Sequence, residues 1–143
     1  MKKALMGVMV LAMFAVACTK SSTSDNSGSI VGKWNLISER VKIYFSGLPL
    51  GEQTQAAKPG QYFDLRTNGT VYVNSYDSTT NTYNLDSGNY TYKGDTLSLS
   101  GAGLDYAVKV QTLNSNTLTL YTSIDSLSLG IPVKTEVWIN LSK

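Results

Sequence analysis

Apolar and polar residues alternate in short segments over most of residues 30–143. Successive side chains of a β-strand point to opposite faces, so this alternation predicts half-buried strands. Asn68-Gly69 stands between two such segments, and Asn-Gly in that setting is a strong signal for a two-residue hairpin turn. No stretch beyond Ser29 has a convincing helical period. We therefore predict a single all-β domain over residues 30–143.

The first predicted strand contains a change of phase. Trp34 and Leu36 occupy even positions, whereas the apolar residues from Val41 to Phe45 occupy odd positions. A β-bulge or sharp bend near residues 38–39 would bring both sets to the same face. With this bent strand counted as one, the pattern predicts eight strands, over residues 31–45, 61–67, 70–77, 88–93, 95–100, 104–112, 117–124 and 134–142.

Most connections between the predicted strands are short, which favours an antiparallel up-and-down arrangement. Eight such strands can close into a barrel that leaves no free edge. The exception is the segment 46–60, SGLPLGEQTQAAKPG, which is too long for a hairpin turn. A loop of this length in a compact domain is often a lid or a binding loop. We expect it to lie over the mouth of the barrel.

The first 17 residues have the pattern of a secretory signal peptide. Lys2 and Lys3 precede an apolar run that ends in Ala15-Val16-Ala17, and the only cysteine of the chain, Cys18, follows at once. The run is shorter than the roughly 20 residues that a membrane-spanning helix needs. The junction resembles the bacterial lipobox, although that motif usually has leucine where Ala15 stands. The resemblance implies cleavage before Cys18 and lipidation of Cys18.

Residues 18–29, which follow the predicted cleavage site, read CTKSSTSDNSGS. A segment so rich in small polar residues cannot bury enough surface to fold, so we predict a flexible tether. It lacks the acidic cluster that resembles a surface-export signal, and Thr19 replaces the aspartate that retains lipoproteins in the inner membrane of enteric bacteria. We therefore expect a lipid-anchored envelope protein on the outer membrane, facing the periplasm.

Composition excludes several classes of partner and cofactor. The formal net charge of +2 comes from Lys2 and Lys3, which leaves ten basic and ten acidic side chains in the rest of the chain. A neutral domain has no electrostatic footprint for nucleic acid. With no histidine and a single cysteine, disulfides and the commoner metal sites are excluded. We expect no metal and no cofactor.

Gly32-Lys33-Trp34, at the start of the first strand, resembles the Gly-x-Trp signature of lipocalins. This motif, the eight-strand meander and the lipobox together make the chain most similar to the lipocalin-like domain of small Bacteroides-type lipoproteins. The resemblance implies that Gly32 and Trp34 belong to a plug at the closed end of the barrel. The chain departs from the family pattern because it has no arginine near the C-terminus to lie across Trp34. Lys143 is the residue that could take the place of this arginine.

The resemblance also implies that the barrel binds or carries a small hydrophobic or amphipathic ligand. Aromatic side chains on the apolar parity of the strands are the candidates to line its cavity, although they could simply complete the core: Phe45, Phe63, Tyr90, Tyr92 and Tyr106. The alternative is a binding or assembly module that contacts a protein or glycan through its outer face. Its candidate residues are Tyr72, Tyr76 and Trp138.

Charge placement argues against catalysis. Nearly all acidic and basic residues within the predicted strands lie opposite the apolar parity, with Glu39 and Asp77 as the exceptions. No inward pair of carboxylates is predicted for acid–base chemistry, and no histidine can activate a nucleophile. We therefore predict that the protein is not an enzyme.

Overall fold

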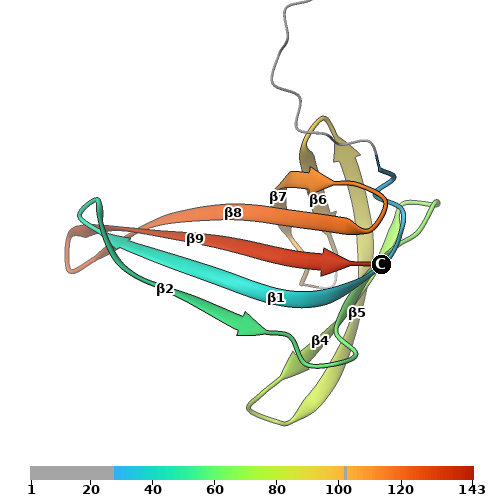
Figure 1. The fold of residues 1–143 in the computed structure, drawn as a ribbon, viewed down its shortest axis with the longest axis horizontal. Coiled ribbons are helices and arrows are strands. Elements are labelled where there is room, and N and C mark those ends of the chain that lie inside the picture. The colour runs from blue at the N-terminus through green and yellow to red at the C-terminus, as the bar shows by residue number, and fades with distance from the viewer. Residues whose placement is uncertain (1–27, 102) are drawn as a thin grey trace, which may run out of the picture.

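The computed structural model describes residues 28–101 and 103–143, which form an antiparallel β structure (Figure 1). The predicted signal peptide (residues 1–17), Cys18 and the tether up to residue 27 lie outside the described residues. The strands are β1 (Gly32–Phe45), β2 (Leu48–Ala56), β3 (Tyr62–Leu65), β4 (Thr70–Asp77), β5 (Thr82–Lys93), β6 (Thr96–Ser100), β7 (Tyr106–Leu113), β8 (Thr117–Ser128) and β9 (Ile131–Ser142). The described part of the chain contains no helix long and apolar enough to cross a membrane.

The strands close into the predicted up-and-down barrel. From β3 to β9 each strand pairs with its neighbour in sequence, and the ring closes because β1 pairs with both β3 and β9. These eight strands are antiparallel throughout. β2 is an additional strand, paired with β1. The prediction of an eight-stranded all-β barrel is therefore confirmed, with one extra strand.

The predicted irregularity in the first strand is a bulge at Ile37. In the ladder between β1 and β9, Leu36 pairs with Leu141 and Ser38 pairs with Asn140, so Ile37 has no partner. The extra residue shifts the parity of β1, and Val41 then pairs with Val137 on the inner face. The bulge lies one residue before the predicted position and has the predicted effect.

The predicted loop over residues 46–60 is wrong, because most of it is strand β2. Leu48–Ala56 pairs with the distal half of β1, from Ser38 to Phe45. Ser46 and Gly47 form the hairpin turn with φ of 50° and 82°, and positive φ at both central residues is the signature of a type I′ turn. Every residue of β2 is exposed, so burial imposes no alternation on its sequence. The segment 46–60 therefore contributes a strand to the barrel wall and does not form a lid over the mouth of the barrel.

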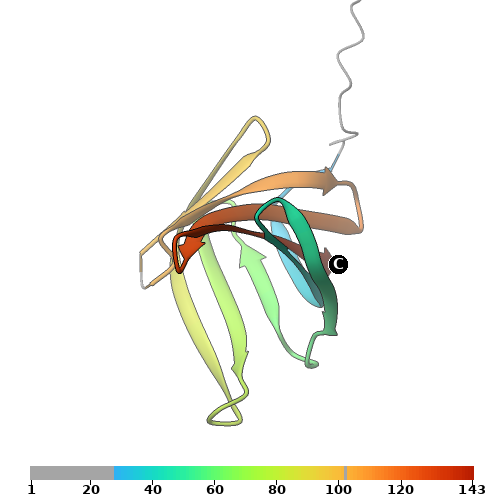
Figure 2. The ribbon, with the colours of Figure 1, turned by 90° about the vertical axis from the view of Figure 1, so that its left-hand side faces the viewer.

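The hydrophobic core fills only one end of the barrel. It consists of Ile30, Trp34, Phe63, Leu65, Val71, Val73, Leu97, Leu99, Leu104, Val108, Val110, Leu113, Leu118, Leu120 and Leu141. Beyond this core the strands continue as two arms that diverge (Figures 1 and 2). The long arm is formed by residues 39–55 of β1 and β2 and residues 122–137 of β8 and β9, and the short arm is the β4–β5 hairpin. The barrel is therefore packed at one end and open at the other.

Candidate functional site

Trp34 closes the packed end of the barrel. Its side chain is fully buried, and its indole Nε1 donates a hydrogen bond to the carbonyl oxygen of Ile30 at 2.8 Å. The ammonium group of Lys143 lies 4.2 Å from the centre of the Trp34 ring. The same ammonium donates to the carbonyl oxygen of Val31 at 3.1 Å. Lys143 thus lies across the tryptophan, in the place that the sequence suggested for it.

Gly32 leaves the room that Lys143 occupies. Its φ is 135°, in the region that side chains with a Cβ rarely adopt. A Cβ built at Gly32 would lie 2.9 Å from Cε of Lys143. In the Gly-x-Trp motif, Gly32 therefore makes room for the aliphatic part of the Lys143 side chain, and Trp34 provides the ring over which the Lys143 ammonium lies.

Three of the candidate cavity residues pack into or against the closed end. Phe63 pairs with Trp34 on β1 and with Val73 on β4, and it is buried. Tyr90 and Tyr92 are partly buried against the core, and burial raises the pKa of both hydroxyls.

The hydroxyl of Tyr90 also donates a hydrogen bond to the carbonyl oxygen of Arg66 at 2.7 Å, so its donor is used within the barrel wall. The structure therefore places Phe63, Tyr90 and Tyr92 among the packed side chains. It does not bring them to the open half of the barrel.

A shallow groove follows the inner face of β1 and β2 in the open half. One hollow of about 260 Å³ is lined by Val41, Ile43, Leu50, Gly51 and Gln53. A second of about 350 Å³ shares Val41 and Gln53 with it and continues toward Glu39. The groove therefore has an apolar end toward the tip of the long arm and a polar end toward the middle of the barrel.

Apolar side chains of the open half remain uncovered. Ile124, Thr135 and Ile43 lie in one row across β8, β9 and β1, on the inner face. Ile124 is 57% exposed and Ile43 is 40% exposed, although both point to the face that forms the core further along the barrel. This row and the adjoining groove form the candidate binding site.

Acidic side chains also occur on the inner face of the barrel, one in the open half and one beside the core. Glu39 lines the groove, and Asp86 pairs with Val73 on the inner parity of β5. Asp86 lies outside the strand predicted at residues 88–93, because β5 begins six residues earlier, at Thr82. Tyr106, another candidate cavity residue, shares this inner face through its pairing with Leu99. Burial and then the Asp86 carboxylate raise the pKa of Tyr106.

Phe45 does not join the other candidate cavity residues. It is the last residue of β1, at the far end of the long arm, where it pairs with Leu48 and Val133. The alternation of β1 places Phe45 on the inner face, as predicted, but Phe45 lies at the end of the long arm, beyond the packed part of the barrel.

A family model agrees with this architecture. The family model of the lipocalin-like domain matches residues 30–120. The chain belongs to this lipocalin-like family. A crystal structure of an uncharacterized protein from Bacteroides eggerthii DSM 20697, determined at 2.60 Å resolution, is 15% identical, with a TM-score of 0.48. The similarity covers 80% of this chain and 100% of that chain. No match was found among curated proteins.

The outer-face candidates of the lipocalin-like barrel do not share one surface. Tyr72 and Tyr76 lie on β4, whereas Trp138 lies on β9, which does not pair with β4. The Arg40 guanidinium lies 3.9 Å from the centre of the Trp138 ring, and the Tyr121 ring lies 5.3 Å from it. Trp138 is therefore packed between neighbouring side chains of the long arm.

Glu136 connects the outer face of β9 with β1 and β8. One carboxylate oxygen lies 2.8 Å from the ammonium of Lys134 and accepts a hydrogen bond from the Tyr121 hydroxyl at 3.0 Å. The other oxygen accepts from the Tyr44 hydroxyl at 3.0 Å. The hydrogen bond from Lys134 is the main cause that lowers the pKa of Glu136. This network fixes the relative positions of three strands of the long arm.

Among the described residues, no polar or charged side chain is buried. The described residues also contain no group of three His, Cys, Asp or Glu side chains arranged to hold a metal ion. The candidate site consequently offers apolar surface, amide and hydroxyl groups, and carboxylates at its polar end.

Proposed function

We propose that the open half of this lipocalin-like barrel binds one small apolar or amphipathic molecule, without catalysis. The observation that carries the proposal is the uncovered inner face of the long arm, where Ile43 and Ile124 are 40% and 57% exposed. Concave apolar surface with a few polar groups is typical of sites for small molecules. The packed core at the closed end leaves the groove beside Val41 and Gln53 as the place for the ligand.

The expected affinity follows from the surface that a ligand would cover. Burial of about 300 Å² of apolar surface, counting ligand and groove together, would contribute about 7.5 kcal/mol. This contribution alone corresponds to a Kd in the micromolar range, which is the upper limit of the affinity because the cost of association is subtracted from it. Gln53, Gln55 and Glu39 at the polar end would bind the head of an amphipathic ligand.

A fluorescence titration with N-phenyl-1-naphthylamine, a neutral apolar probe, tests this site. Val41→Trp fills the groove from the inner face of β1 and should raise the Kd of the probe at least about tenfold, the equivalent of about 1.4 kcal/mol. Lys42→Trp places the same ring on the opposite face of the same strand and is the matched control. If the two variants weaken binding equally, or if the parent protein does not bind the probe, the proposed site is wrong.

We also propose that Cys18 carries the lipid that anchors the protein to the cell envelope. The support is its position directly after Ala15-Val16-Ala17 and before a segment rich in serine and threonine. An acylated cysteine with more than one chain would hold the protein stably on a membrane. Cys18→Ser should therefore move the protein from the membrane fraction to the soluble fraction. A variant that still fractionates with membranes as the parent does would refute the anchor.

A further inference from the structure

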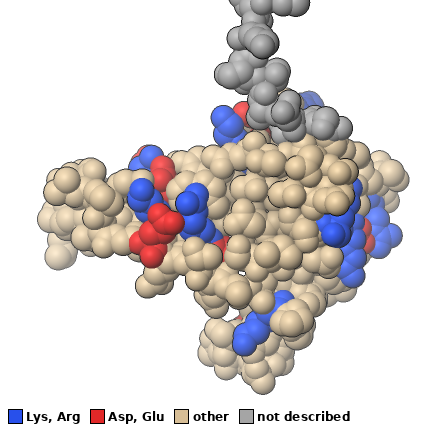
Figure 3. All heavy atoms as spheres, in the orientation of Figure 1, with Lys and Arg blue, Asp and Glu red and all other residues tan. Residues whose placement is uncertain are grey.

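The end of the long arm is a protruding apolar tip. It consists of two hairpin ends, residues 45–51 and residues 126–133, and neither contains a charged residue. The backbone amide of Ser46 donates to the carbonyl oxygen of Pro132 at 2.8 Å, so the two hairpin ends lie side by side. In the space-filling view the charged atoms form a band across the arm, and the part beyond the band carries none (Figure 3).

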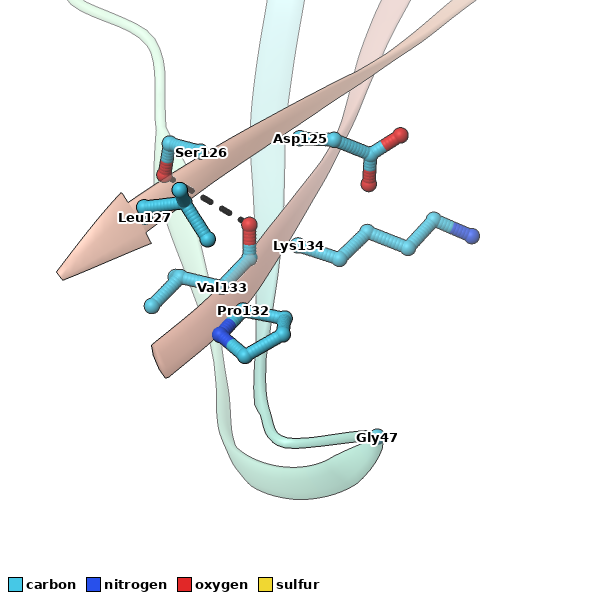
Figure 4. A pocket seen from close by; sticks show the side chains of 7 residues that line it. All are labelled: Gly47, Asp125, Ser126, Leu127, Pro132, Val133 and Lys134. Atoms are coloured by element: carbon cyan, nitrogen blue, oxygen red, sulfur yellow. Dashed lines mark hydrogen bonds between the residues drawn. The ribbon is translucent and has the colours of Figure 1, made fainter. Parts of the chain in front are cut away.

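Leucine side chains of the tip are exposed to an unusual degree. Leu129 is 100% exposed, and Leu48, Leu50 and Leu127 are 71%, 68% and 73% exposed. Single exposed apolar residues are common, but a contiguous exposed group marks a surface for a partner or a membrane. A shallow hollow of about 330 Å³ at the base of the tip is lined by Leu127, Pro132 and Val133, and also by Asp125 and Lys134 (Figure 4).

The tip is apolar on both faces of the sheet, which distinguishes a membrane from a protein partner. Leu127 pairs with Pro132 on the outer parity, whereas Phe45 pairs with Leu48 and Val133 on the inner parity. A docked protein would cover one face and leave the other exposed to water. A lipid layer surrounds an inserted tip on all sides.

The residues directly behind the tip are those that favour a membrane interface. Tyr44, Tyr121 and Trp138 lie on the outer face of the arm, next to Lys42 and Lys134. The Lys42 and Lys134 ammonium groups lie 5.0 Å and 5.8 Å from the centre of the Tyr44 ring. Aromatic rings and lysines with long apolar stems are enriched at the level of lipid headgroups.

Charge in this band is balanced, because Arg40, Lys42 and Lys134 are matched by Glu52, Asp125 and Glu136. Acidic partners lie close to two of the basic groups, with Glu52 3.4 Å from Arg40 and Glu136 2.8 Å from Lys134. The arm therefore has no excess charge with which to attract anionic lipid. Insertion of the tip would depend on apolar contact and would tolerate salt.

We propose that the apolar tip inserts into the phospholipid layer on which the protein is anchored, which places the mouth of the barrel beside the lipid. This inference rests on the proposed anchor at Cys18. Nine residues separate Cys18 from Gly28, and the ten Cα-to-Cα steps between these two residues can extend about 35 Å at most. β1, with 14 residues, spans about 46 Å at most from Gly32 to the tip. The start of β1 can therefore stand at most about 35 Å above the membrane while the tip, about 46 Å away along the strand, reaches the lipid. Both lengths are satisfied when β1 is inclined by up to about 50° to the membrane plane.

The test places a polarity-sensitive dye on one residue of the processed protein in vesicles of phosphatidylethanolamine and phosphatidylglycerol. Leu129→Cys carries the dye on the apolar tip, and Thr79→Cys carries it on the exposed end of the β4–β5 hairpin as the matched control. The parent protein treated with the dye is the blank for any label on Cys18. Lipids brominated on their acyl chains report insertion by quenching.

Dye at residue 129 should shift to the blue and be quenched at least about threefold more than dye at residue 79, and about 1 M salt should leave this difference intact. Equal quenching at the two positions would overturn the proposal, because the tether alone would then explain proximity to the lipid. Loss of the difference in high salt would also overturn it. If Cys18 is not acylated, the protein leaves the membrane fraction, yet quenching at residue 129 by added vesicles still reports on the tip, so the two failures are distinguishable.

Discussion

Replacement of Trp34 by alanine measures how far the closed end of the barrel depends on its plug. The indole is fully buried, and removal of a large buried aromatic side chain costs about 3–5 kcal/mol. The carbonyl oxygen of Ile30 also loses its hydrogen bond from Nε1, which adds about 1 kcal/mol or more. The lost ring contact of the exposed Lys143 ammonium adds about 0.5 kcal/mol. We expect Trp34→Ala to lower the free energy of unfolding by about 5 kcal/mol in total.

Urea denaturation followed by circular dichroism is the assay. With a slope of about 1.5 kcal/mol per molar urea, the expected loss lowers the midpoint by about 3 M. Trp34→Phe keeps most of the ring and should lose about 2 kcal/mol, while Trp138→Ala, on the outer face, should lose about 1 kcal/mol. If Trp34→Ala keeps the parent midpoint while probe binding falls, Trp34 contacts ligand instead of closing the barrel, and the structural reasoning is refuted.

Two further substitutions test the closed end and the long arm. Gly32→Ala should lose about 1–3 kcal/mol of stability by urea denaturation, because φ at this residue is 135° and the new Cβ would meet the Lys143 side chain; a midpoint equal to that of the parent would contradict this account of the motif. Glu136→Gln should be less stable than the parent at neutral pH, because the pKa of Glu136 is lowered in the folded state. The contribution of the carboxylate is complete above the pKa of the unfolded chain, about 4.3, and is lost as pH falls through the folded pKa. The difference in urea midpoint between parent and Glu136→Gln should therefore shrink as pH falls below about 4, and a difference that grows there would contradict the assigned sign.

The sequence predicted the part of the fold in which burial imposes a pattern. Trp34 and Val41 lie on opposite parities, and this mismatch was sufficient to predict the bulge that the structure has at Ile37. β2 was missed because all of its residues are exposed, so its side chains carry no alternation to detect. The first half of β5 was missed for a related reason. Residues 82–87 lie in the short arm, beyond the core, where no face of the strand is buried and burial therefore imposes no alternation on the sequence.

The candidate site was predicted less well because parity gives the face of a residue but not its position along the barrel. Phe63 and Phe45 share the inner parity, yet one is buried beside Trp34 and the other lies at the tip of the long arm. The inner face that remains uncovered, around Ile43, depends on how far the strands extend beyond the core. The sequence pattern predicted the extent of β1, but it revealed neither the pairing of β1 with β2 nor the last four residues of β8, which lengthen the arm.

Binding of a small molecule in the open half is the central claim, and native mass spectrometry of protein purified without detergent tests it most directly. We expect the parent protein to carry an additional mass of one small apolar or amphipathic molecule, held in the groove beside Val41. Val41→Trp should be recovered without that mass, whereas Lys42→Trp should retain it. A parent protein that is empty in every preparation, and stays empty after incubation with apolar probes, would contradict the claim.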